Sequence, residues 1–168
     1  MNKTLVVLTG AGSNINSMVN NILKKKVVIE RKESGAPYLE GSDLSFSLSH
    51  KEKLVCFAIS PKAVGVDIEK IVEKDSIYGI AERYFGEPIE VGDALAFYTA
   101  WTRREALSKL VGTGLNKELL STDLSSGEYQ TDEGMVVFRS WEDEGYLITV
   151  ACYDDAPEFK KDIKKQEE

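Results

Sequence analysis

The stretch from Phe97 to Leu115 reads FYTAWTRREALSKLVGTGL, and it predicts the helix around which the rest of the chain is arranged. It is rich in good helix formers, lacks proline and ends at a Gly-x-Gly stop. At about 100° per residue, Glu105 and Lys109 fall within roughly the same 60° arc of one face. One interpretation is a common surface ion pair worth about 0.3 kcal/mol. The other is a carboxylate and an ammonium group directed together at a functional site.

A second acidic stretch lies upstream, where residues 63–71 read AVGVDIEKI. Valine and isoleucine alternate here with Gly65, Asp67 and Glu69, which is the period of a strand with one apolar face. Asp67 and Glu69 therefore project from the same face. The pair is either part of a solvated sheet face or, if Glu105 comes near, part of an all-oxygen site. Such a site suits a hard divalent ion such as Mg²⁺, which recruits substrate phosphates.

Four stretches, in this order, resemble the 4′-phosphopantetheinyl transferase superfamily, in its surfactin-synthetase-activating type. They are RKESGAPYLEG (31–41), FSLSH (46–50), GVDIE (65–69) and WTRREALSK (101–109), the last followed by Gly-x-Gly-Leu at 112–115. The family has comparable elements at Gly-Lys-Pro-Tyr-Leu, Asn-x-Ser-His and Trp-x-x-Lys-Glu-Ala-x-x-Lys. No single stretch is decisive, but four in order form a specific pattern.

The resemblance implies an α+β fold of two similar α/β halves in one chain, a pseudo-dimer, with the site in the cleft between them. Residues 1–64 are expected to form a shortened N-terminal half with room for one helix. Residues 65–153 are expected to form the C-terminal half that carries the metal and catalytic residues. The charged segment 154–168 has little to bury, so we expect a mobile tail.

The resemblance also implies an activity. This is the Mg²⁺-dependent transfer of the 4′-phosphopantetheine arm from coenzyme A, the co-substrate, to a serine of an acyl- or peptidyl-carrier protein. Adenosine 3′,5′-bisphosphate is released. The alternative is a weak or inactive relative that serves as a coenzyme A-binding or regulatory protein.

The implied site residues fall into three groups. The metal ligands would be Asp67, Glu69 and Glu105, and Glu105 and Lys109 would be catalytic. Coenzyme A would be bound by Lys109 and by three residues further upstream, namely Arg31, Ser49 and His50. Arg31 belongs to a basic cluster between residues 24 and 33, which is either a solvated helix end or a phosphate-facing surface. Ser49 and His50 are predicted at the tip of a hairpin loop, 49–52, between strands at 45–48 and 53–59.

Three residues depart from the family pattern. Ala36 and Arg104 stand where the family commonly has lysine, and Ser47 stands where it commonly has asparagine. None of them removes a predicted metal ligand, although Ala36 bears on affinity for coenzyme A. For docking of an acidic carrier protein we hypothesise a local basic patch that includes Arg83, Arg103 or Arg104.

Composition limits the remaining classes. The chain has 168 residues, 42% of them hydrophobic, which is enough for a packed core, and a formal net charge of −7 argues against a nucleic-acid partner. No apolar run approaches the roughly 20 residues of a membrane span, so a cytoplasmic protein without membrane contact is expected. Its two cysteines are predicted to be buried free thiols. A monomer or a small homo-oligomer is expected.

Overall fold

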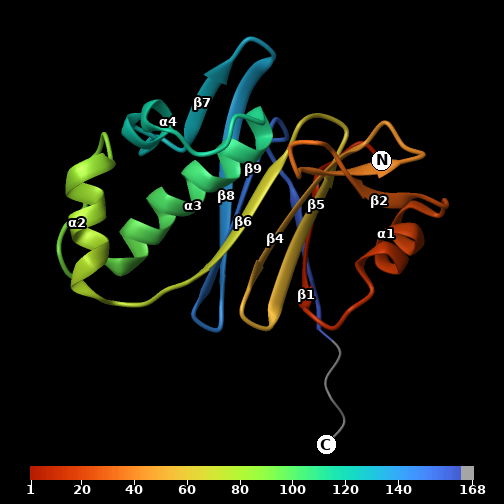
Figure 1. Ribbon diagram of the computed structural model, residues 1–168, viewed down its shortest axis with the longest axis horizontal. Helices are drawn as coiled ribbons and strands as arrows, with labels where there is room; N and C mark the ends of the chain where they lie inside the picture. Colours follow the sequence, from red (N-terminus) through yellow and green to blue (C-terminus); the bar gives the residue numbers. More distant parts are fainter. Residues whose placement is uncertain (164–168) are drawn as a thin grey trace, which may run out of the picture.

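Two four-stranded sheets share one core and are flanked by helices on their outer faces, in a computed structural model that describes residues 1–163 (Figure 1). The elements of the first part are β1 (Leu5–Gly10), α1 (Ile15–Leu23), β2 (Val28–Arg31), β3 (Pro37–Glu40), β4 (Ser45–Lys51) and β5 (Leu54–Ser60). Those of the second part are β6 (Gly65–Lys70), α2 (Asp75–Tyr84), α3 (Ala94–Val111), α4 (Lys117–Ser121), β7 (Glu128–Thr131), β8 (Gly134–Asp143), β9 (Tyr146–Cys152) and β10 (Glu158–Asp162).

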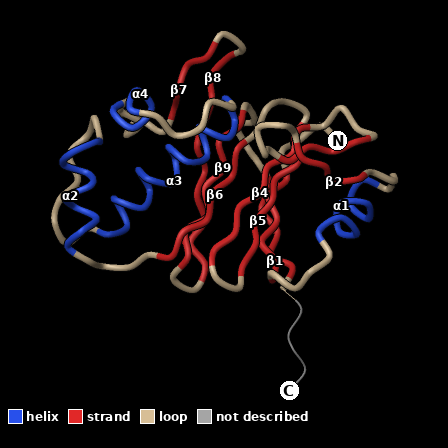
Figure 2. Tube along the Cα trace, viewed as in Figure 1, coloured by secondary structure: helices blue, strands red, loops and turns tan. Residues whose placement is uncertain are grey.

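The two sheets have a related strand order. One runs β10-β1-β5-β4 and the other β6-β9-β8-β7, and β2 and β3 form a separate hairpin. In the first sheet β1 pairs with β5, and β4 lies on the other side of β5. In the second sheet β6 pairs with β9 in the same way, and β8 lies on the other side of β9. Helices α1 and α3 occupy opposite outer sides of the molecule, with α2 beside α3 (Figure 2). The mixed α+β class predicted from the sequence is therefore confirmed.

Alternation along the strands divides the apolar residues between the layers. Val6 and Leu8 of β1 join Val66 and Ile68 of β6 in the core between the sheets. The intervening Val7 faces α1 instead, in a separate cluster. Because Val66 and Ile68 face inward, the alternate residues of β6, Gly65, Asp67 and Glu69, must face outward, toward α3.

The edges of the two sheets meet where β4 lies against β6, and side chains bridge this seam. The Ser47 hydroxyl accepts a hydrogen bond from the Val66 N–H at 3.1 Å. The Ser49 hydroxyl accepts one from the Ile68 N–H at 3.4 Å. Serine hydroxyls therefore satisfy β6 amides that would face a neighbouring strand's carbonyls in a continuous sheet.

Two expectations need correction. Ser49 and His50 lie within β4, which extends to Lys51, and not in a loop, because the hairpin turn consists of Glu52 and Lys53 alone.

The second correction concerns the tail predicted at 154–168. Residues 158–162 form β10, which pairs parallel with β1. Phe159 stacks on Trp141 with ring centroids 4.8 Å apart, and Lys161 pairs with Asp143 at 2.9 Å. These contacts order a segment that looks too polar for a strand. Residues 164–168 lie outside the described part of the chain.

Two other features bear on the expectations from composition. Both cysteines, Cys56 and Cys152, are free and buried, as predicted. None of the helices within residues 1–163 is long and apolar enough to cross a membrane.

Candidate functional site

Gly65 lets helix α3 rest directly on strand β6. A Cβ atom at this position would lie 1.7 Å from the carbonyl oxygen of Ala106 and 2.8 Å from the backbone nitrogen of Leu110. No side chain fits in that space, so only glycine permits this approach. The close approach brings Glu105 and Lys109 of α3 beside the outward-facing carboxylates of β6. The sequence pattern included Gly65 only as one position of an alternating strand.

Asp67 is the most buried of the predicted site residues, with 5% of its surface exposed. Its Oδ1 accepts a hydrogen bond from the Ser49 hydroxyl at 3.0 Å and lies 3.6 Å from Lys109 Nζ. Its Oδ2 is buried and has no hydrogen-bond partner among residues 1–163. Burial raises the pKa of Asp67 to about 7, because the Lys109 charge opposes the shift only in part while Glu69 and Glu105 add to it.

Lys109 reaches from α3 into the seam between the sheets. Its Nζ donates to the carbonyl oxygen of Val66 on β6 at 2.9 Å and to that of Leu48 on β4 at 3.3 Å. About 31% of the side chain remains exposed. The ammonium group is therefore held in a fixed position beside Asp67 while it stays accessible to a ligand.

The other two predicted metal ligands, Glu69 on β6 and Glu105 on α3, lie close enough to Asp67 to act on its pKa. Glu69 forms an ion pair with Lys51 at 3.0 Å and has 20% of its side chain exposed. Glu105 is half-buried, and burial raises its pKa, with the Lys109 charge opposing and the Glu69 charge adding to the shift. Within residues 1–163, no three His, Cys, Asp or Glu side chains come together closely enough to form a ready-made metal site.

A cavity of about 750 Å³ opens at the other end of the seam. Its walls include the first residues of β4, the end of α3 and the β2–β3 hairpin, and both Arg31 and Lys109 line it. Ala36 also lies in the wall, where a lysine would have added a cation, but the neighbouring Lys32 lines the cavity as well. The cavity is large enough for a nucleotide-sized ligand. The basic cluster predicted at 24–33 therefore contributes two cations to it.

Ser49 and His50 do not act as the predicted pair at a loop tip. As neighbours in a strand they point to opposite faces. The Ser49 hydroxyl is directed to Asp67, whereas His50 is exposed, and neither is among the residues that line the 750 Å³ cavity. Contact with a phosphate stays a prediction for both residues.

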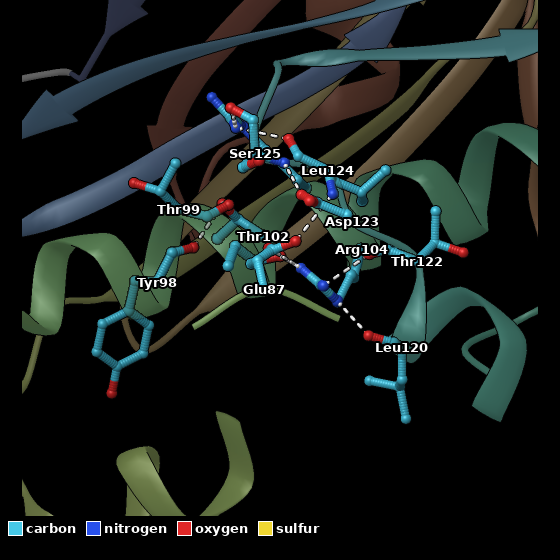
Figure 3. A network of polar contacts seen from close by, with 12 residues as sticks. Glu87, Tyr98, Thr99, Thr102, Arg104, Leu120, Thr122, Asp123, Leu124 and Ser125 are labelled. Atoms are coloured by element: carbon cyan, nitrogen blue, oxygen red, sulfur yellow. Dashed lines mark hydrogen bonds and ion pairs between the residues drawn. The ribbon is translucent and has the colours of Figure 1, made fainter. Parts of the chain in front are cut away.

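Arg104 holds together the segments that support α3, a role that the sequence did not indicate (Figure 3). The side chain is fully buried, and its guanidinium donates to the carbonyl oxygens of Leu120, Thr122 and Ala100 at 2.8–2.9 Å. It also pairs with Glu87 Oε1 at 2.8 Å. Lysine cannot replace this planar set of donors, which explains arginine at this position.

The docking patch hypothesised to include Arg83, Arg103 or Arg104 therefore needs correction. Arg104 is not available to a partner, and Arg103 is half-buried and donates to the carbonyl oxygen of Leu124 at 2.8 Å. Arg83 is the exposed member of the three, with its guanidinium carbon 5.4 Å from the Tyr84 ring centroid.

Comparison with known proteins gives consistent matches. Residues 63–156 match the family model described as the 4′-phosphopantetheinyl transferase superfamily. The chain is 31% identical over 121 residues to the 4′-phosphopantetheinyl transferase gsp of Aneurinibacillus migulanus, a match that covers 67% of this chain and 50% of that protein. It is 34% identical over 98 residues to a 4′-phosphopantetheinyl transferase of Bacillus subtilis, covering 52% and 42%. It is 29% identical over 158 residues to 4′-phosphopantetheinyl transferase Sfp of Bacillus subtilis (strain 168), covering 83% and 68%. The chain thus spans about half the length of the first two relatives.

Proposed function

The chain belongs to the 4′-phosphopantetheinyl transferase superfamily, and from this premise we propose that it transfers the 4′-phosphopantetheine arm of coenzyme A to a serine of an acyl- or peptidyl-carrier protein. The observation that carries the proposal is the position of Lys109. This one side chain lines the 750 Å³ cavity and also lies 3.6 Å from Asp67 at the group of carboxylates. A pyrophosphate that extends from the cavity to the carboxylates would contact this ammonium group.

Asp67 Oδ2, which has no hydrogen-bond partner in the part of the chain that the structure describes, supports a divalent cation at this site. A buried carboxylate oxygen without a donor is costly, and a cation beside it would remove that cost. The donor set is all oxygen, which suits Mg²⁺. Asp67, Glu69 and Glu105 would hold the ion, and Glu69 and Glu105 lie close enough to Asp67 to raise its pKa. When bound, Mg²⁺ neutralises the pyrophosphate charge that would repel a nucleophile.

The remaining steps are assigned to side chains of this protein. Arg31 and Lys32 would bind a phosphate group of coenzyme A in the cavity, and Lys109 would hold the phosphoryl group that is transferred. Glu105 would accept the proton of the carrier serine hydroxyl, and its raised pKa makes it a stronger base than an exposed glutamate.

The reaction balances as a substitution at the β-phosphorus. The serine oxygen forms a bond to this phosphorus, and the bond from phosphorus to the oxygen shared with the α-phosphate breaks. That oxygen leaves with the electron pair as part of adenosine 3′,5′-bisphosphate. The serine proton passes to Glu105.

The related strand order of the two sheets supports a second part of the proposal, namely that the molecule is a single-chain pseudo-dimer with its site between the halves.

Mass spectrometry of an apo-carrier protein tests the function directly. The carrier is incubated with this protein, coenzyme A and MgCl₂, and the expected result is a mass gain of one phosphopantetheine arm. Glu105→Gln should reduce the rate by about 10² to 10⁴, the usual contribution of a general base. No mass gain with any acyl- or peptidyl-carrier protein, together with measurable binding of coenzyme A, would support the inactive-relative alternative.

A further inference from the structure

The carboxylates of the site have a competitor for the metal within the same chain. We propose that Lys51 is a built-in counter-ion of Glu69, and that a divalent cation must displace the Lys51 ammonium group before Glu69 can bind it. This inference rests on the proposed function, because it takes Asp67, Glu69 and Glu105 as the metal ligands.

Strand β4 runs beside β6, and alternate side chains of β4 contact the successive carboxylates of β6. Ser49 donates to Asp67 at 3.0 Å, and Lys51, two residues further along the same face of β4, pairs with Glu69 at 3.0 Å. The lysine thus reaches Glu69 from the neighbouring strand β4, and both side chains are partly exposed there. Its ammonium group occupies space next to Glu69 Oε2 that a metal ion would also use.

Two lysines neutralise the carboxylates, but only one of them is free to move. Lys109 Nζ, next to Asp67, also donates to the carbonyl oxygens of Val66 and Leu48. In the described part of the chain, Lys51 Nζ has Glu69 as its single hydrogen-bond or ion-pair partner. Its side chain is 42% exposed, so the ammonium group can turn into water when Glu69 is taken. Lys109 therefore stays in place, and Lys51 is the group that leaves.

Electrostatics gives the size of the expected effect. Near Glu69 an ammonium group repels a doubly charged ion, and at about 6 Å in a water-like dielectric this repulsion reduces affinity by about tenfold. Salt screens charges at this partly exposed position, so the reduction should be smaller at high ionic strength.

Isothermal titration of MgCl₂ into the metal-free protein tests the inference without any readout of transfer. Lys51→Met should tighten the Mg²⁺ dissociation constant by about five- to tenfold in low salt, and by less in 0.5 M KCl. Lys51→Arg keeps the charge and should bind Mg²⁺ as the wild type does. The matched control is Lys53→Met, an exposed lysine in the hairpin turn two residues away, which should leave the dissociation constant unchanged.

The outcomes separate this inference from the proposed function. Equal or weaker Mg²⁺ binding by Lys51→Met, with wild-type binding that is lost in Asp67→Asn, overturns the role of Lys51 and leaves the metal site standing. A gain of the same size in Lys53→Met also overturns it, because the effect would then come from net charge alone. If neither the wild type nor Lys51→Met binds Mg²⁺, the metal site and the counter-ion are both rejected.

Discussion

Asp67 is a buried carboxylate, and only one of its two oxygen atoms has a hydrogen-bond partner among the described residues. Burial disfavours its charged form in the absence of a metal, so a charged Asp67 costs the folded state free energy. This cost is explained by a binding site and not by the needs of a hydrophobic core. Alternation along residues 64–69 was enough to predict that Asp67 and Glu69 share a face. The burial of Asp67 could not be predicted, because it depends on how closely α3 approaches β6.

Asp67→Asn should stabilise the metal-free protein at neutral pH. The folded-state pKa of Asp67 is about 7, against an ordinary value of 3.8, so the folded state binds the proton more tightly than the unfolded state. The free energy of unfolding should therefore fall as pH rises from about 4 to 7, by up to about 4 kcal/mol from this group.

Urea denaturation between pH 4 and 8, in the presence of EDTA, measures this dependence. The asparagine variant should lose the decline and be more stable than wild type at pH 8. Asp132→Asn, a control at the exposed β7–β8 turn, should follow the wild-type curve. A variant that is less stable than wild type at pH 8 would contradict the expectation.

The structural role of Arg104 could not be predicted from the sequence. An arginine in a helix is usually on the surface, and its acceptors on Glu87, Leu120 and Thr122 come from other segments with no periodic signal to connect them. Arg104→Lys keeps the charge but loses most of the donors. It should lower the free energy of unfolding by about 1–3 kcal/mol in chemical denaturation, since buried carbonyls lose their partners. Arg83→Lys, an exposed control on α2, should change it by less than about 0.5 kcal/mol.

At the scale of elements, the contact between α3 and β6 decides the geometry of the site. Helix α3 was predicted from its helix formers and its glycine stop, and it spans Ala94–Val111 with Gly112 as its C-cap. Strand β10 was missed because its sequence, EFKKD, contains one large apolar residue. The loop predicted at Ser49 and His50 was wrong because polar residues at a sheet edge can continue a strand when they bridge to a neighbouring element.

Gly65→Ala should move α3 away from β6 and disturb the site. The added methyl group would meet the helix backbone at 1.7 Å, so the helix must shift or the protein must lose stability. We expect a loss of about 1–3 kcal/mol, as for other overpacked sites. The matched control is Gly79→Ala in α2, where the added Cβ would have no atom of residues 1–163 within 4 Å beyond its own helix backbone and chain neighbours. This variant should gain about 0.5–1 kcal/mol of stability. Thermal melts of the two variants give the comparison, and equal stability of both would contradict it.

At the scale of the whole molecule, ligand and metal should stabilise the fold together. Coenzyme A at about 100 times its dissociation constant, with Mg²⁺, should add about 2.7 kcal/mol, which corresponds to a rise in Tm of about 5–11 °C for a chain of this size. Either ligand alone should give a smaller rise, and Asp67→Asn should lose the part that depends on Mg²⁺. Differential scanning fluorimetry measures these shifts. The proposed site is wrong if coenzyme A with Mg²⁺ leaves the wild-type Tm unchanged.

The serine-bridged seam between β4 and β6 should open locally more easily than the rest of either sheet. The amides of Val66 and Ile68 are held by single hydroxyl groups and not by a strand ladder, so they can open while both sheets stay intact. In hydrogen–deuterium exchange monitored by NMR, these two amides should exchange faster than the amides of Ile148 and Val150 on β9, a central strand of the same sheet. Coenzyme A bound across the seam should slow Val66 and Ile68 selectively. The seam at which the two sheets can separate locally is therefore also the place where bound coenzyme A would hold them together.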